Sequence, residues 1–257
     1  MVKIIFGPTG VGPIKDVVKT LERYSEEGLK AAEFAFTYGA YIKKDDAIDL
    51  GKAIKKLGMS LSIHAPYYVN LNSKEKEKVS ASKKRILECC EIGHYLGVKK
   101  IVFHAGFYSE MSREDAFQNI KREVSELMKE VKKNKWDVEL CPEVMGKINV
   151  FGSVEEISRL VNETGCGFCI DFAHVLARYK SYNFDLIEKS FPQEKWQCHF
   201  SGIEYGDKGE KNHILTKKEE WKKLLDFLDG LKKEVVIINE SPSPEEDAVK
   251  GLKIFSS

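Results

Sequence analysis

The chain has 257 residues, of which 42% are hydrophobic and 32% are charged, and its formal net charge is +1. These totals are typical of a soluble globular protein, and no apolar run approaches the roughly 18 residues that a membrane span requires. The charge excludes a global basic field of the kind that marks a nucleic-acid-binding protein, so a polyanionic partner must be held locally. The amino terminus enters strand-like sequence at once, which predicts a cytoplasmic protein without a signal peptide.

Short β-rich runs alternate with longer amphipathic runs along the whole chain. Eight runs have the composition of strands: residues 3–7, 31–36, 60–65, 100–106, 137–143, 167–171, 196–200 and 235–240. Helical periodicity appears between them in residues 14–27, 47–58, 80–97, 113–134, 153–165 and 217–231. This alternation predicts a parallel (β/α)8 TIM barrel, and the absence of a linker predicts one domain over residues 1–257.

Two long segments lack clear periodicity, residues 64–76 and residues 201–216. Both follow predicted strand ends, on the face of a barrel where βα loops build active sites. The six cysteines lie in apolar segments, which indicates reduced, buried thiols rather than a disulfide framework. Cys166 and Cys169 form a C-x-x-C, but no second pair at zinc spacing accompanies them, so we expect neither a redox nor a zinc role for this motif.

Residue types that bind metals fall at the carboxyl ends of six consecutive predicted strands. They are His64, His104, Glu143, Asp171, His199 and Glu240. His174 and His213 add two imidazoles from the loops that follow the sixth and seventh strands. A lone histidine is more often a hydrogen-bonded structural residue than a ligand, but of the six histidines only His94 lies on a predicted helix. Because strand ends converge on the axis of a closed barrel, we expect these side chains to share one pocket.

The charges of this set favour a bound metal. Glu143, Asp171 and Glu240, brought together at the mouth of an apolar barrel, would repel one another and lose hydration unless cations neutralised them. Divalent metals provide that charge. Neutral imidazole combined with carboxylate suits zinc, manganese or iron, and the number of histidines favours zinc.

The same motifs resemble the endonuclease IV family, the second family of apurinic/apyrimidinic (AP) endonucleases, within the xylose-isomerase-like TIM barrels. The similarity covers nearly the whole chain and includes IHAPYYVNL at 63–71, VFHAG at 102–106, CIDFAH at 169–174 and INESPSPEEDAVKGL at 238–252. Its most specific element is Asp171-x-x-His174 at a strand end, together with the histidine of IHAPY. The resemblance implies a DNA-repair enzyme that hydrolyses the phosphodiester on the 5′ side of an abasic site in double-stranded DNA, with a cluster of three zinc ions.

The resemblance also implies how the ligands are shared among the ions. One ion would be held by His64 and His104, with Glu143 bridging to a second. The second ion would be completed by Asp171, His199 and Glu240, and the third would be held by His174 and His213. A hydroxide shared by the first two ions would then be the nucleophile, so the bridging glutamate is the expected catalytic residue and no separate side-chain base is needed.

Tyr67 matches a family tyrosine that engages DNA where the abasic nucleotide is extruded. An aromatic lid over the barrel rim is an equally good interpretation of this residue. The sequence departs from the family pattern at Lys211, where the third metal usually takes an aspartate. Either Asp207 or Glu210 replaces that ligand, or Lys211 supplies a fixed positive charge near the leaving group, or the site holds only two metals. The expected cofactor is therefore two or three Zn²⁺ ions, with Mn²⁺ as the alternative.

Two other functions fit parts of the pattern. A sugar isomerase or epimerase of the xylose-isomerase-like superfamily would need only one Mn²⁺ or Mg²⁺ ion, held by a Glu, Asp, His, Glu quartet that Glu143, Asp171, His199 and Glu240 could form. A non-catalytic barrel that retains some ligands is the other alternative. The remaining four histidines, which an epimerase does not require, favour the nuclease. We expect a monomer with no membrane partner.

Overall fold

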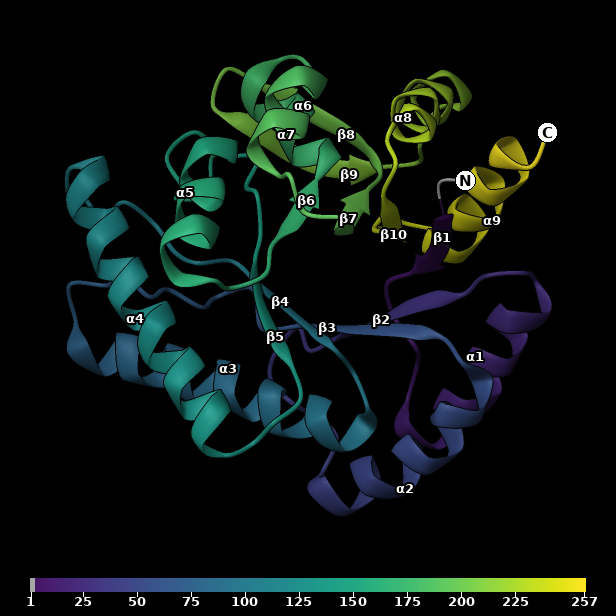
Figure 1. Ribbon diagram of the computed structural model, residues 1–257, viewed down its shortest axis with the longest axis horizontal. Helices are drawn as coiled ribbons and strands as arrows, with labels where there is room; N and C mark the ends of the chain where they lie inside the picture. Colours follow the sequence, from purple (N-terminus) through teal and green to yellow (C-terminus); the bar gives the residue numbers. More distant parts are fainter. Residues whose placement is uncertain (1–2) are drawn as a thin grey trace.

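Eight parallel strands form a closed barrel in the computed structural model, which describes residues 3–257 (Figure 1). The barrel strands are β1 (Lys3–Pro8), β2 (Ala31–Ala35), β3 (Ser60–His64), β4 (Lys100–Phe103), β5 (Glu139–Pro142), β6 (Cys169–Asp171), β7 (Lys195–Phe200) and β10 (Glu234–Asn239). Hydrogen bonds order them as β1-β10-β7-β6 and β2-β3-β4-β5. Parallel bridges between Thr9 and Glu33 and between Glu143 and Cys169 join the two sheets. The predicted TIM barrel and its eight strands are therefore confirmed.

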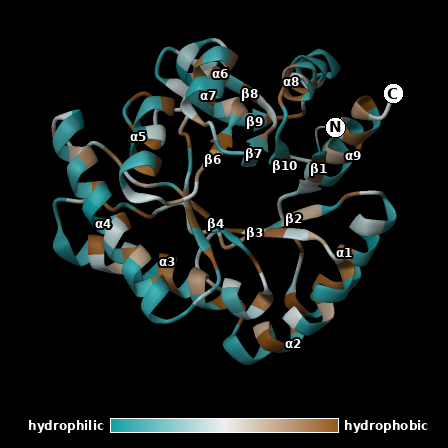
Figure 2. Cartoon of the chain, viewed as in Figure 1, coloured by the Kyte–Doolittle hydropathy of each residue, from teal (hydrophilic) through white to brown (hydrophobic). Residues whose placement is uncertain are grey.

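The helices surround the barrel and bury their apolar faces against it. They are α1 (Val17–Glu26), α2 (Lys44–Ile54), α3 (Lys76–Leu96), α4 (Arg113–Lys133), α5 (Val154–Thr164), α6 (Phe172–Tyr179), α7 (Phe184–Ser190), α8 (Lys218–Gly230) and α9 (Pro244–Phe255). Hydrophilic residues dominate their outer faces (Figure 2). Helices α6, α7 and α9 were not anticipated from periodicity. Helix α6 has only eight residues, fewer than the window over which helical periodicity is recognised.

Strand register places the inward-facing side chains. Because side chains alternate along a strand, Gln197 and His199 of β7 face the barrel interior, while Trp196 and Cys198 join the main hydrophobic core. Asp171 pairs in register with His199. The carboxyl ends of β6 and β7 therefore present a carboxylate and an imidazole at the same level of the barrel.

The segment 201–216, expected as an irregular loop, is instead an antiparallel hairpin of β8 (Gly202–Gly206) and β9 (Gly209–Ile214). Gly209 has a φ of +97°, a left-handed conformation that favours glycine at this turn. A Cβ atom on Gly209 would also lie 2.1 Å from the carbonyl oxygen of Gly146. The hairpin can therefore pack closely on the β5–α5 loop. Within residues 3–257, no helix is long and apolar enough to cross a membrane.

Candidate metal centre

The residues predicted from strand ends come together at the carboxyl end of the barrel. Their ligand atoms lie within 4.8 Å of one another in overlapping groups. Three of these groups are His64, His104 and Glu143; Glu143, Asp171, His199 and Glu240; and Asp171, His174 and His213. Each group mixes imidazole and carboxylate donors, and shared carboxylates connect one group to the next.

Glu143 lies at the centre of the cluster. Its Oε2 atom is 3.2 Å from Nε2 of His64 and 3.0 Å from Nε2 of His104. Its Oε1 atom is 3.1 Å from Nδ1 of His199. The two carboxylate oxygens therefore face different imidazoles, which is the arrangement that a bridging ligand requires.

Hydrogen bonds orient three of the imidazole rings. Nδ1 of His64 lies 2.7 Å from the carbonyl oxygen of Ala65, so this nitrogen donates and Nε2 faces Glu143. Nδ1 of His174 lies 3.1 Å from a backbone carbonyl oxygen of the β5–α5 loop, and Nδ1 of His213 lies 2.7 Å from the hydroxyl of Ser201. Contacts of this kind fix the tautomer and direction of a ligating histidine.

The cluster is strongly coupled electrostatically. Burial acts to raise the pKa of Glu143, but His199, together with His104 and His64, outweighs it and holds this pKa well below its usual range. Burial lowers the pKa of His64, yet the nearby carboxylates, led by Glu143, raise it overall to about 9. The pKa of His174 is also raised to about 9, against burial, by Asp171 and other carboxylates. Positive charge is therefore strongly favoured among these side chains.

Buried carboxylate oxygens that lack a hydrogen-bond partner indicate whether a metal ion would fit this site. Asp171 caps α6, and its Oδ1 accepts the backbone N–H of His174 at 2.8 Å. Its Oδ2, like Oε2 of Glu210, is buried without a hydrogen-bond partner within residues 3–257. Buried carboxylate oxygens are costly to leave unpaired. A cation of the zinc class held by Asp171, His174 and His213 would satisfy Oδ2 of Asp171, and the nitrogen and oxygen donors present are those such a cation uses.

Glu210 lies beside the third group of donors, next to His174. Oε2 of Glu210 lies 3.3 Å from Nε2 of His174, and a Cβ on Gly146 would lie only 2.5 Å from that oxygen. Lys211, the next residue on β9, is exposed, and its side chain lies beside Gly206 on the hairpin. Asp207 is exposed in the turn. Of Asp207, Glu210 and Lys211, the residue whose side chain contacts His174 is Glu210.

A cavity of about 420 Å³ opens above the cluster, and its walls include Tyr67, Phe107 and Lys147. Tyr67 is 44% exposed, and the centroid of its ring lies 4.8 Å from that of His64. Tyr67 therefore lies over the imidazoles at the rim. Lys147 lines this cavity, whereas Lys211 is not among its lining residues. Nζ of Lys147 is 3.5 Å from Oε1 of Glu210, so the nearby positive charge comes from the β5–α5 loop.

Sequence reasoning missed Glu33, which is fully buried in β2 with Oε2 3.2 Å from Nε2 of His199. A charged residue within the otherwise apolar run at 31–36 was the available signal, because strand residues of this barrel are buried on both faces. It also missed Lys147, for which the sequence offered no signal.

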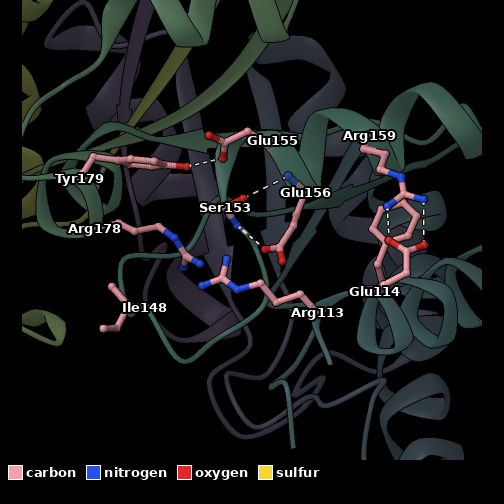
Figure 3. Close-up of a pocket in the computed structure, with 10 residues that line it drawn as sticks. Arg113, Glu114, Ile148, Ser153, Glu155, Glu156, Arg159, Arg178 and Tyr179 are labelled. Carbon is pink, nitrogen blue, oxygen red and sulfur yellow. Dashed lines mark hydrogen bonds and ion pairs between the residues drawn. The ribbon is translucent and has the colours of Figure 1, made fainter. Parts of the chain in front are cut away.

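A second cavity, of about 520 Å³, lies beside α4 and α5, and the charged residues that line it make structural contacts (Figure 3). Its Arg159 makes a bidentate pair with Glu114, at 2.6 and 3.0 Å. Its Glu156 accepts the backbone N–H groups of Gly152 and Ser153 and so caps α5. These carboxylates are used in structural bonds, and their ligand atoms do not converge as those of the metal centre do.

Arg178 of this second cavity supports the wall of the first. This buried guanidinium donates to the carbonyl oxygens of Met145, Lys147 and Val150, at 3.2, 2.6 and 3.1 Å. Its other terminal nitrogen lies 3.2 Å from the hydroxyl of Tyr108. Because Met145, Lys147 and Val150 line the metal cavity, Arg178 holds the loop that shapes it.

Comparisons with known proteins agree with this architecture. A model of the xylose isomerase-like TIM barrel family matches residues 21–257. The chain is 33% identical to the uncharacterized protein MJ0133 of Methanocaldococcus jannaschii, over 99% of this chain and 98% of that protein. It is 25% identical to a probable endonuclease 4 of Mycoplasmopsis synoviae (strain 53), over 78% of this chain and 67% of that protein.

Two solved structures illustrate the range of proteins that share the fold. Endonuclease IV from Thermus thermophilus matches with a TM-score of 0.74 and 22% identity, over 99% of this chain and 97% of that chain. A D-psicose 3-epimerase in the presence of D-fructose matches with a TM-score of 0.72 and 15% identity, over the whole of both chains. At these identities the likeness shows the fold alone.

Proposed function

The chain belongs to the xylose isomerase-like TIM barrel family, and within it we propose a metal-dependent phosphodiesterase that cleaves DNA on the 5′ side of abasic sites. One observation carries the proposal. Imidazole groups flank the Glu143, Asp171, His199 and Glu240 quartet on two sides, and each flanking group shares a carboxylate with it. The similarity to proteins named probable endonuclease 4 supports the same function.

The flanking histidines discriminate between the two catalytic hypotheses. A mononuclear isomerase or epimerase requires the quartet and an open position for the sugar. His64 and His104 instead face Oε2 of Glu143, the oxygen turned away from His199. A second group of donors at this point suits two or more ions, and polynuclear sites stabilise both the attacking and the leaving oxygen of a phosphodiester.

The surface around the cavity also suits a nucleic acid. The large hydrophobic residues exposed within residues 3–257 all lie in segments that follow the carboxyl ends of barrel strands. They are Tyr38, Tyr41, Tyr67, Tyr68, Phe107, Ile148, Tyr205 and Leu215. Exposed aromatic side chains provide stacking surfaces for unpaired bases and sugars, and such stacking does not depend on base sequence. Their concentration at this face supports a substrate with splayed nucleotides rather than a small sugar alone.

The chain's own residues would divide the work as follows. Zinc-class ions, when bound, would polarise the phosphate and supply a nucleophile near neutral pH. Glu143 would hold two ions at a fixed separation, through oxygens already directed at different imidazoles. Tyr67 would exclude water from the rim beside His64, and Lys147 would attract the phosphate at the cavity wall.

A duplex with one synthetic abasic site tests the proposal. The purified protein with Zn²⁺ or Mn²⁺ should nick the strand on the 5′ side of the lesion, and prolonged chelation should abolish the nick. Glu143→Gln should reduce the rate at least a hundredfold. Glu139→Gln, at the exposed amino end of the same strand, is the matched control and should retain full activity.

Metal analysis and a sugar assay examine the alternative. The nuclease predicts two or three ions per chain, whereas the epimerase predicts one. The quartet and the shared fold with D-psicose 3-epimerase keep the epimerase as the second candidate. Intact abasic DNA under saturating Zn²⁺ and Mn²⁺, combined with interconversion of ketoses, would replace the nuclease with that candidate.

A further inference from the structure

A buried carboxylate on β2 lies beneath the candidate ligands. Glu33 is fully buried, and its Oε2 accepts the hydroxyl hydrogen of Ser62 at 2.7 Å. The same oxygen lies 3.2 Å from Nε2 of His199. Within residues 3–257 no lysine or arginine pairs with Glu33, and its Oε1 has no hydrogen-bond partner. The carboxylate therefore depends on His199 and Ser62 for its stabilisation.

The ring of His199 has carboxylates at both of its nitrogens. Nδ1 lies 3.1 Å from Oε1 of Glu143 and 3.5 Å from Oε2 of Glu240, so it faces the metal centre. Nε2 faces Glu33 on the opposite side. A neutral imidazole carries one N–H, and only its other nitrogen can bind a metal. The side on which that hydrogen lies decides whether His199 can act as a ligand.

We propose that Glu33 is a positioning residue for the metal centre, which accepts the Nε2–H of His199 and so presents Nδ1 to the ion held by Glu143, Asp171 and Glu240. The inference rests on the proposed metal centre but is independent of the substrate. Partners of this kind fix ring orientation and increase the basicity of the ligating nitrogen.

Strand register holds Glu33 in this position. Glu33 on β2 pairs directly with Ser62 on β3, and both side chains point into the barrel. The hydroxyl of Ser62 donates to Glu33 and accepts from Nε2 of Gln197 at 3.5 Å. Gln197 precedes His199 by two residues on β7, so it faces the same interior. This chain of bonds keeps Oε2 directed at the imidazole.

Cys169 is the other candidate partner for His199. Its Sγ lies within 4.8 Å of ligand atoms of both Glu143 and His199. Nε2 of His199, however, lies at hydrogen-bond distance, 3.2 Å, from Oε2 of Glu33. Sulfur is a weak hydrogen-bond acceptor compared with a carboxylate oxygen, so Glu33 is the dominant acceptor.

Cobalt titration measures the effect on metal binding without any substrate. Co²⁺ absorbs visible light when bound, so occupancy can be followed directly. Glu33→Gln should weaken one Co²⁺ site by about 10- to 100-fold and leave the remaining sites within about twofold. Ser62→Ala keeps the carboxylate and should cause a smaller loss. Glu123→Gln, a buried carboxylate on α4 that pairs with Lys83, is the matched control and should leave every site unchanged.

The tautomer of His199 gives a second readout in the unmodified protein. ¹⁵N NMR of the zinc-loaded protein should show the hydrogen on Nε2 and the metal on Nδ1. This measurement decides the question even if Glu33→Gln does not fold. Metal on Nε2, or cobalt affinity unchanged in Glu33→Gln, would overturn the role of Glu33 and leave the proposed function intact. No metal binding by the unmodified protein would overturn both.

Discussion

Loading of the centre with metal is expected to release protons. In the metal-free protein the pKa values of His64 and His174 are both about 9, because neighbouring carboxylates outweigh the effect of burial. Both imidazoles therefore carry a proton at pH 7. A metal ion binds only the neutral ring, so each proton must leave when the ion enters.

The size of the effect follows from these values. Two pH units separate pH 7 from a pKa of about 9, so roughly one ring in a hundred is neutral at pH 7. Deprotonation then costs about 3 kcal/mol for each ring, which is about a hundredfold in metal affinity. Saturation with Zn²⁺ at pH 7 should release about two protons from His64 and His174 together. The pKa of His199 is raised too, so a third proton is expected from that ring.

Calorimetric titration with Zn²⁺ in two buffers of different ionisation enthalpy counts the released protons. The unmodified protein should release at least about two at pH 7 and markedly fewer at pH 10. His64→Gln should release about one fewer, and His94→Gln, on the outside of the barrel at the end of α3, should match the unmodified protein. Release of less than half a proton at pH 7, with full metal loading, would refute the electrostatic description of the cluster.

Three further predictions concern stability and the third ligand group. His64 and His174 have higher pKa values in the folded protein, about 9, than in the unfolded chain, 6.5, so their protonation stabilises the metal-free fold fully below pH 6.5. This stabilisation is lost as pH rises through about 9, and urea denaturation should show the free energy of unfolding falling between pH 6.5 and 9. Gly146→Ala should displace the carboxylate of Glu210 and crowd the ring of His174, whose nearest atoms would lie 2.5 and 3.0 Å from the new Cβ, and should remove one metal equivalent measured by elemental analysis while the circular dichroism spectrum is retained. Arg178→Met should lower the free energy of unfolding by about 3 kcal/mol, because three carbonyl oxygens of the β5–α5 loop lose their donor.

Each of these has a result that contradicts it. Metal-free stability that stays level or rises from pH 6.5 to 9 would mean that the histidines are not paired with carboxylates as described. Full metal content in Gly146→Ala would place Glu210 outside the ligand set. A loss below about 1 kcal/mol in Arg178→Met, with unchanged amide exchange in residues 145–150, would show that the loop is held by other contacts.

The barrel could be predicted because its strands are short apolar runs separated by amphipathic helices, and that pattern is local in the sequence. The candidate metal-binding residues could be predicted for the same reason, since each lies at or just beyond the end of such an apolar run. The hairpin β8–β9 could not be predicted in this way. Burial along its two strands does not alternate, and its geometry depends on glycines that allow close contact with the β5–α5 loop.

Lys211 shows how such a hairpin changes the interpretation of a motif. The resemblance to the endonuclease IV family implies a metal ligand at this position. In the hairpin, Glu210 and His213 face His174, while Lys211 lies on the exposed side beside Gly206. A register shift between Glu204 and Tyr205 accompanies this exchange. The sequence offered Asp207 and Glu210 as alternatives for this position, and the hairpin register brings the carboxylate of Glu210, one residue earlier than Lys211, next to His174.

Glu33 and Glu210 lead to one physical conclusion about the centre. Both carboxylates lie against imidazoles and have an unpartnered buried oxygen, but they face different sides of the cluster. Glu210 lines the open cavity, where an ion can reach its oxygen. Glu33 lies below His199 in the closed barrel, where its carboxylate can act on an ion only through the imidazole. We therefore expect Glu210 to contact an ion directly and Glu33 to act on the centre through His199.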